Sequence, residues 1–229
     1  MPPNPTPKQT FKLSPSSLNL MEECPRCFWL HFNGKKRPSG IFPSLPSGMD
    51  KILKIHFDKF MEKGILPPEI RKTEECKGCK LFNNKELLDL WRNNRKGLML
   101  KDKEGNILGG AIDNLLIRGK KLIVLDYKTR GFPLKDDTHE HYQAQLDIYN
   151  FLLRKNGYET EDFSFLLFYI PKHVMETGEV VFDTHLIKMK VDVKNAEKIW
   201  KKALKILNSP CPKKHHEKVC PWCENVGEE

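Results

Sequence analysis

The sequence lacks long hydrophobic runs. Its longest apolar run, Phe165 to Ile170, is far too short to cross a membrane, and the opening segment MPPNPTPKQTF has no apolar core of the kind that signal peptides carry. It also has no Walker-type phosphate loop, internal repeat or low-complexity core, so we expect neither a built-in motor nor a repeat architecture. These absences favour a cytoplasmic protein with no membrane partner.

The composition is ordinary for a globular protein, but the charge is not balanced. The 229 residues carry a formal net charge of +9, with 39% hydrophobic and 30% charged residues, enough to bury one substantial core. Clustered Lys and Arg gain affinity for polyanions by releasing phosphate counterions, which favours nucleic acid, DNA above all, as the partner. A basic protein without such a partner fits the charge equally well.

Hydrophobic periodicity predicts an α/β fold with a central mixed β-sheet flanked by helices. The run LIVLDY, at 122–127, has the continuous apolar character of a central strand that becomes polar at its tip. We expect a disordered tail over residues 1–12, one domain over 13–209 and a cysteine-rich tail over 210–229. Helices are expected over 15–23, 49–64, 85–93, 139–155 and 193–207, and strands over 98–101, 107–117, 122–128, 163–170 and 180–191.

The stretch GGAIDNLLIRGKKLIVLDYKTR, residues 109–130, reads as two strands joined by a tight turn. Asp113 lies on the first strand, and Asp126 and Lys128 lie two apart on the second, so their side chains project from the same face. A hard divalent cation held by carboxylates activates water and offsets phosphate charge, and a nearby lysine stabilises developing negative charge. Taken alone, Asp126 and Lys128 are better explained as an exposed ion pair on a sheet.

Six of the seven cysteines occur as C-x-x-C pairs. In a chain that is not exported, this spacing favours metal or iron–sulfur ligation over disulfides. CPRC, with Cys24 and Cys27, and CPWC, with Cys220 and Cys223, share one form and together supply a complete tetrahedral set of four thiolates. We therefore expect a clamp between the two ends of the chain, holding either [4Fe–4S] or Zn²⁺.

The third pair, Cys76 and Cys79 in CKGC, has no obvious partner pair. Cys211 with His215 or His216 would complete a site there, while free thiols in a loop explain the pair equally well.

The order of three motifs resembles the PD-(D/E)XK nuclease superfamily, and more closely its RecB-like branch, which includes the CRISPR-associated RecB-type exonucleases. The motifs are GGAID at 109–113, LDYK at 125–128 and QLDIY at 145–149, and His56 upstream matches the extra metal-site histidine of that branch. Asp126 stands where many relatives have Glu, which the superfamily pattern allows. The resemblance implies a restriction-endonuclease-like fold.

The resemblance also implies a role for each site residue. Asp113 and Asp126 would bind Mg²⁺ or Mn²⁺ together with the carbonyl of Tyr127, and His56 would be a further ligand. Lys128 would act on the attacking water. Supporting contacts to the lysine, the metal-bound water or a phosphate would come from Gln145 and Tyr149, which lie four apart on one helix face.

The cysteines depart from the iron–sulfur members of that branch. Those nucleases clamp one N-terminal cysteine to a C-terminal group of three, whereas this chain has two N-terminal cysteines. An alternative set is therefore Cys24, Cys211, Cys220 and Cys223, although we favour the two-plus-two arrangement.

The function that these observations predict is metal-dependent cleavage of DNA. We expect an exonuclease acting on single-stranded or end-containing DNA in repair, recombination or CRISPR-type processing, with a helicase or another pathway partner supplying movement. Two alternatives stay open at this point: a non-cleaving nucleic-acid-binding module on a nuclease-like scaffold, and a metal-clamped adaptor that uses its basic surface for protein or RNA contacts.

Overall fold

Strand β6, Lys121–Thr129, is the central strand of the larger of two sheets. Its alternate side chains enter two separate hydrophobic cores: Leu122 and Val124 lie in one, and Ile123 and Leu125 lie in the other. Because neighbouring side chains of a strand point to opposite faces, a strand that is apolar throughout needs cover on both sides. The central strand expected from LIVLDY is confirmed.

The computed structural model describes residues 9–38, 40, 43–213 and 220–224. The larger sheet has the order β2-β5-β6-β7-β8 and the smaller sheet the order β1-β4-β3. The other strands are β1 Lys12–Leu13, β2 Lys80–Leu81, β3 Leu98–Lys101, β4 Ile107–Gly110, β5 Asn114–Arg118, β7 Phe163–Val174 and β8 Val180–Lys190. The α-helices are α1 Pro15–Glu23, α2 Pro25–Phe32, α3 Ser44–Glu62, α4 Pro68–Arg71, α5 Lys85–Trp91, α6 Gln143–Lys155, α7 Val193–Leu207 and α8 Pro221–Glu224; two 3₁₀ turns are η1 Glu74–Cys76 and η2 Glu140–Tyr142.

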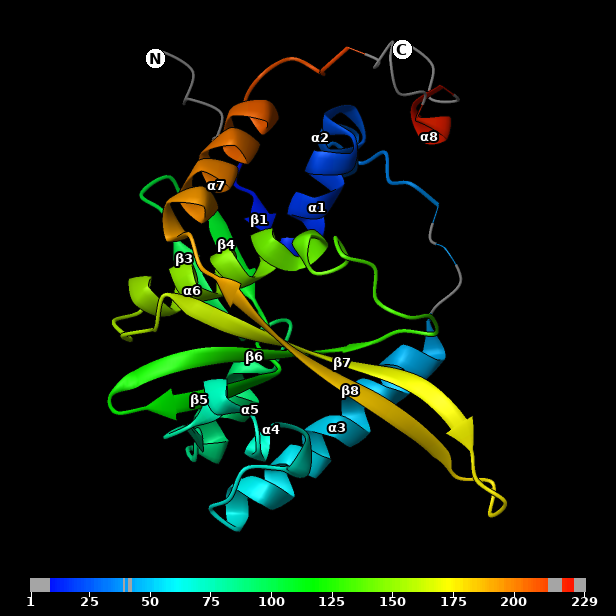
Figure 1. Cartoon of the computed structure of the whole chain (residues 1–229). Helices are drawn as coiled ribbons and strands as arrows, with labels where there is room; N and C mark the ends of the chain where they lie inside the picture. The colour runs from blue at the N-terminus through cyan, green and yellow to red at the C-terminus, as the bar shows by residue number, and fades with distance from the viewer. Residues whose placement is uncertain (1–8, 39, 41–42, 214–219, 225–229) are drawn as a thin grey trace, which may run out of the picture.

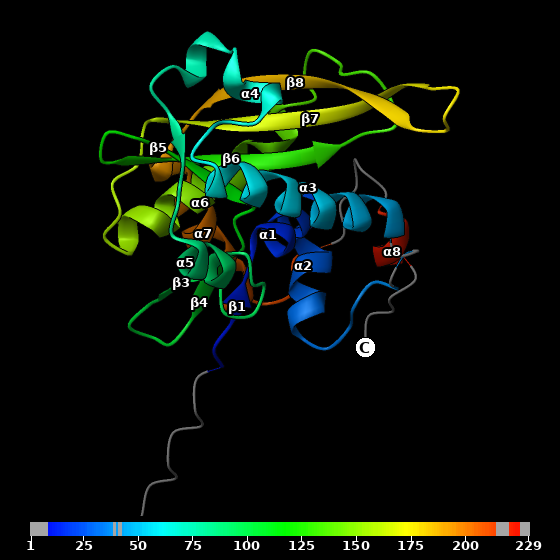
Figure 2. The same ribbon diagram turned by 90° about the horizontal axis from the view of Figure 1, so that it is seen from below.

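Helices cover both faces of the five-stranded sheet. In Figure 1, α3 and α4 lie below the sheet while α1, α6 and α7 lie above it, and Figure 2 shows α3 running beside β6. Strands β6 and β7 are parallel, with α6 in the connection between them, and the other neighbours in this sheet are antiparallel. The mixed sheet flanked by helices is therefore confirmed.

A buried carboxylate fixes helix α6 against helix α7. Asp147 is fully buried and accepts hydrogen bonds from the Asn195 amide and from the backbone N–H of Asp192, each at 2.8 Å. The Gln143 amide donates to it as well, at 2.7 Å. Buried polar groups that are fully hydrogen-bonded specify one arrangement of the elements around them. The first turn of α6 is thus held in one position over the sheet.

The strand expected over 107–117 is in fact two strands that belong to different sheets. β4 ends at Gly110, β5 begins at Asn114, and Ile112 donates its backbone N–H to the Trp91 carbonyl instead of to a sheet neighbour. At the end of β4 the Tyr149 ring of α6 packs directly against the backbone of Gly110, and a side chain at residue 110 would not fit there. Asp113 consequently stands at the junction between the two sheets.

The expected disordered tail is also corrected in part. Residues 1–8 lie outside the described residues, but Phe11 and Leu13 are buried. The backbone of residues 12–13 pairs in parallel with β4 as strand β1, and Asn106 accepts from the Phe11 N–H at 3.0 Å. A two-residue strand has no periodicity to detect, so its partner on β4 decides its conformation.

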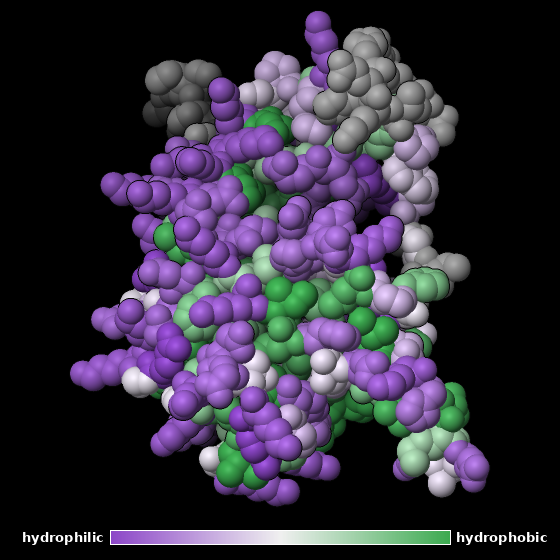
Figure 3. All heavy atoms as spheres, in the orientation of Figure 1, coloured by the Kyte–Doolittle hydropathy of each residue, from purple (hydrophilic) through white to green (hydrophobic). Residues whose placement is uncertain are grey.

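The other expected elements are present with shifts at their ends, whereas α2, α4, β2 and α8 were not expected. α7 has the expected bounds, whereas α3 starts at Ser44 and β7 extends to Val174 in a hairpin whose outer part is exposed. Among the described helices, none combines the length and the apolar character that a membrane crossing requires. Figure 3 shows a largely hydrophilic surface over α7, with apolar side chains gathered over α3, β7 and β8.

The packing of α6 on β4 generates a testable prediction. A Cβ at Gly110 would lie 2.8 Å from Cε1 of Tyr149 and 3.2 Å from Cδ1 of Leu152, so Gly110→Ala must displace the buried ring. We expect it to lower the free energy of unfolding by about 1–3 kcal/mol, the usual cost of overpacking. Urea unfolding followed by circular dichroism measures this change.

The neighbouring glycine is the matched control. A Cβ at Gly109 would meet its nearest atoms at 3.6 Å and 3.7 Å, which are ordinary contacts. Equal destabilisation by Gly109→Ala and Gly110→Ala would contradict the packing described here.

Candidate active site and cysteine cluster

Asp113 and Asp126 meet at the point where β5 and β6 pair. Asn114 is opposite Leu125 in the antiparallel register, which places the residues just before and just after them side by side. The Asp113 carboxyl group is close enough to raise the pKa of Asp126, and Asp113 Oδ2 accepts from the backbone N–H of Tyr127 at 3.3 Å. Asp126 is 1% exposed. Two carboxyl groups of the chain thus share one buried place.

The protonation of Asp126 reflects this crowding. Burial raises its pKa to about 7, the Lys128 ammonium opposes the rise, and the Asp113 carboxylate adds to it. Two carboxylates in contact away from water repel each other unless a cation or a proton lies between them. Oxygen ligands of this kind are those that Mg²⁺ and Mn²⁺ prefer, so the donor set suits a hard divalent cation.

Lys128 lies on the same face of β6 as Asp126, as the two-residue spacing predicts. Its Nζ is 2.5 Å from Asp126 Oδ2 and 4.8 Å from the centre of the Tyr142 ring. Burial would lower the pKa of Lys128, but the attraction of Asp126 outweighs it and the pKa is raised. The lysine therefore stays charged, and it is a buried partner of the site rather than an exposed surface ion pair.

Gln145 and Tyr149 reach the same carboxylate from helix α6. The Gln145 amide donates to Asp126 Oδ1 at 3.2 Å and to the Tyr149 hydroxyl oxygen at 2.8 Å. Beside them, a polar cleft of about 370 Å³ is lined by Gly109–Ala111, by Asn94 and by the first turn of α1. The first turn of α1 has well-defined geometry, because Ser14 and Ser17 form a reciprocal capping box.

Tyr127 faces away from the carboxylates. Its ring packs against Phe57 at 4.7 Å between centroids, and its hydroxyl oxygen accepts from the Asn114 amide at 2.6 Å. Only its main chain borders the site, where its N–H holds Asp113. The metal-ligand role of its carbonyl stays a prediction.

His56 is paired with a different carboxylate, so its role as a ligand of the same cation stays a prediction. Its Nε2 lies 2.9 Å from Oε1 of Glu69, and its ring packs against Phe60 at 4.9 Å between centroids. Glu69 also accepts from the Tyr169 hydroxyl at 3.0 Å. Successive residues of a helix are turned by about 100°. His56 comes two positions after Lys54, which contacts Asp113, and therefore lies on the opposite side of α3. His56 therefore belongs to the packing of α3 on α4.

Two residues of α3 that the sequence analysis missed do reach the site. Lys54 Nζ lies 3.0 Å from Asp113 Oδ1 and 2.8 Å from Asp50 Oδ2. Arg92 also contacts Asp113, because its Nε donates to the Asp113 carbonyl at 2.8 Å, while its NH1 pairs with Asp58 at 2.9 Å. The spacing of Asp50, Lys54 and Asp58, which puts a lysine between two aspartates on one helix face, is the sequence signal for this arrangement.

The four cysteines of CPRC and CPWC come together at the end of α1 and the start of α8. Their sulfur atoms all lie within 4.8 Å of one another, with Cys24 and Cys27 3.3 Å and 3.0 Å from Cys223. Burial opposes ionisation of Cys220, but backbone N–H groups of the CPWC turn lower its pKa to about 6. Convergent sulfurs with N–H donors fit the thiolate ligands of a zinc or iron–sulfur site.

Of the described residues, this is the one group of three or more such ligands brought so close. Cys211 lies outside it, with its sulfur directed at the Pro212 carbonyl at 3.7 Å, so the geometry favours the two-plus-two set over the alternative. Cys76 and Cys79 are buried beside β2, and burial raises the pKa of both thiols. His215 and His216 lie outside the described residues.

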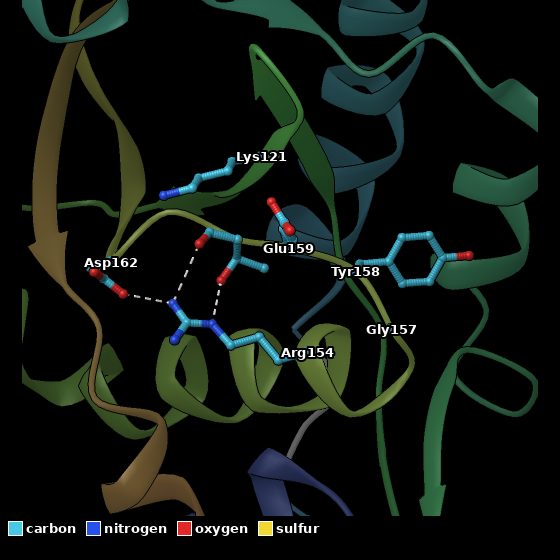
Figure 4. Close-up of a pocket in the computed structure, with 7 residues that line it drawn as sticks. Lys121, Arg154, Gly157, Tyr158, Glu159 and Asp162 are labelled. Carbon is cyan, nitrogen blue, oxygen red and sulfur yellow. Dashed lines mark hydrogen bonds and ion pairs between the residues drawn. The ribbon is translucent and has the colours of Figure 1, made fainter.

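A second pocket, of about 440 Å³, lies at the other end of α6 (Figure 4). Arg154 spans it, donating to Thr160 Oγ1 and to Asp162 Oδ1, each at 2.8 Å. Nine helical positions separate Arg154 from Gln145, which is about 14 Å along the axis. The pocket is therefore separate from the carboxylates, and its arginine is already paired.

The chain can be compared with known families, curated proteins and solved structures. The model of the PD-(D/E)XK nuclease superfamily matches residues 12–226, and no curated protein matches the chain. Among solved structures, one described as the crystal structure of SSO0001 is similar over 89% of this chain and 80% of that chain, with 16% identity and a TM-score of 0.43. The RecB-like branch stays a prediction. The match over nearly the whole length shows that this chain belongs to the PD-(D/E)XK nuclease superfamily.

Proposed function

We propose that the protein is a Mg²⁺- or Mn²⁺-dependent nuclease that hydrolyses DNA phosphodiester bonds. The observation that carries the proposal is that Asp113, Asp126 and Lys128 lie together in a largely buried site. The chain belongs to a nuclease superfamily, for which such a group of residues has a catalytic use. Replacing buried charged groups by apolar ones is often neutral or stabilising, so stability alone does not account for this acidic pair. The net charge of +9 supports a polyanionic substrate.

Each residue has a distinct part in the proposed reaction. Asp113 and Asp126 would hold the cation. When bound, the cation lowers the pKa of its bound water and offsets the charge of the phosphate. Lys128, kept charged by Asp126, faces the same place and would stabilise negative charge that develops on the phosphate. Gln145 holds Asp126 Oδ1 and so keeps the carboxylate in one orientation, with Tyr149 fixing the Gln145 amide in turn.

The finer parts of the proposal concern substrate and pathway. The order of the motifs resembles the RecB-like branch, and this resemblance supports an exonuclease that acts on single-stranded or end-containing DNA. It also supports a role in repair, recombination or CRISPR-type processing. The cleft of about 370 Å³ beside Gln145 would admit the sugar-phosphate chain. With no motor motif in the sequence, movement along DNA would come from a helicase or another partner.

The proposal predicts loss of cleavage with retention of binding. Asp113→Asn and Lys128→Met should each reduce Mg²⁺-dependent cleavage of labelled single-stranded DNA by about 10²-fold or more, because each removes charge needed in the transition state. DNA affinity, measured by fluorescence anisotropy in Ca²⁺, should change little. EDTA should abolish wild-type cleavage.

Asp183→Asn is the matched control. This carboxylate on β8 is 49% exposed and pairs with Lys172, away from Asp126, so its loss should leave cleavage unchanged. Wild-type cleavage rates in both Asp113→Asn and Lys128→Met would show that the site is not catalytic and would favour a non-cleaving binding module.

We further propose that Cys24, Cys27, Cys220 and Cys223 hold [4Fe–4S] or Zn²⁺. Anaerobically purified protein should contain iron with sulfide, or zinc, and Cys27→Ser or Cys220→Ser should lose the metal and lower the melting temperature, since binding energy at such a site is folding energy. Elemental analysis and the visible spectrum distinguish the two metals.

Cys211→Ser should keep both metal and stability, because Cys211 lies outside the group. Loss of metal from Cys211→Ser, with the metal kept in Cys27→Ser, would instead support the alternative set of Cys24, Cys211, Cys220 and Cys223.

A further inference from the structure

Helix α3 places a third carboxylate near Asp113 and Asp126. Asp50 and Lys54 are one helical turn apart, and the Lys54 ammonium bridges Asp50 Oδ2 and Asp113 Oδ1 at 2.8 Å and 3.0 Å. Burial raises the pKa of Tyr149, and Asp126, Asp113 and Asp50 all add to that rise. The Lys54 ammonium thus joins Asp50 of α3 to Asp113.

Two other titratable residues of α3, His56 and Asp58, are engaged elsewhere. His56 pairs with Glu69 on the far side of the helix. Asp58, one turn beyond Lys54, is bound by Arg92 at 2.9 Å and by Lys85 at 3.1 Å. Asp50 is 44% exposed, and its one ion-pair partner among the described residues is Lys54. Of these α3 carboxylates, Asp50 is the one left to serve the site.

Lys54 has the position of a stand-in cation. Buried or half-buried carboxylates are stable in a protein when a positive charge lies between them. The Lys54 ammonium meets that need for Asp50 and Asp113, as the Lys128 ammonium does for Asp126. A divalent cation that binds Asp113 would compete with Lys54 for the same carboxylate.

We propose that Asp50 is the third protein ligand of the catalytic cation, in the role that the family resemblance assigns to His56. Lys54 is then a positioning residue that neutralises the empty site and yields Asp113 to the cation when it binds. Asp50 would stay paired with the displaced ammonium, which would offset negative charge on the phosphate. This inference rests on the proposed function only in taking Asp113 and Asp126 as cation ligands.

Mn²⁺ binding to the intact protein without DNA tests the inference, with free Mn²⁺ measured by electron paramagnetic resonance. Asp50→Asn should weaken the affinity by about tenfold or more, the scale on which groups around a metal act. Asp50→Glu, which keeps a carboxylate, should restore most of it. Lys54→Met should tighten Mn²⁺ binding severalfold, because the competing ammonium is gone, and yet slow DNA cleavage.

His56→Ala is the matched control on the same helix, and it should bind Mn²⁺ like the wild type. Loss of Mn²⁺ in His56→Ala, with wild-type affinity in Asp50→Asn, would overturn the inference and leave the proposed nuclease intact. Wild-type Mn²⁺ affinity in Asp113→Asn would overturn both this inference and the proposed nuclease site, because Asp113 would then not be a cation ligand. Unchanged or weaker binding in Lys54→Met would overturn the competition between lysine and metal.

Discussion

The structure depends on the burial of negative charge where β5 and β6 pair. Asp126 is 1% exposed and shares its place with Asp113, so each neighbouring element must supply compensation. β6 supplies the Lys128 ammonium, α3 supplies Lys54, and α6 supplies the Gln145 amide. None of these groups would be needed if the two positions were apolar. The folded protein thus holds charges together that repel each other, which makes sense when a cation and a phosphate complete the balance.

The change of sheet between β4 and β5 makes that arrangement possible. A continuous strand through residues 107–117 would keep Asp113 in a ladder, with its backbone fully paired. Because β4 ends at Gly110 and Ile112 bonds to Trp91, the chain turns from one sheet to the other and brings Asp113 opposite Asp126. The same glycine lets Tyr149 approach, and Tyr149 orients Gln145. One residue without a side chain thus serves both sides of the site.

The sequence predicted features that follow from local periodicity. The alternation along β6 put Asp126 and Lys128 on one face, and the apolar stripe of α7 marked its bounds. Other features depended on partners far away in the sequence. The pairing of Lys12 with β4 and the break at residue 111 have no local pattern, and the rotation of α3, which decides between His56 and Lys54, is set by Phe57 packing on Tyr127. A helical period shows which residues share a face but not which face meets the site.

The cysteine cluster has a consequence for the order in which the protein can be assembled. Cys24 and Cys27 stand where α1 ends and α2 begins, and the sulfurs that meet them come 193 to 199 positions later in the chain. The opposite end of α1 lines the cleft beside Gln145. During synthesis the four cysteines can therefore meet only after nearly the whole chain has been made, whereas β1 and the buried residues of α1 can hold the wall of the cleft against the core before that.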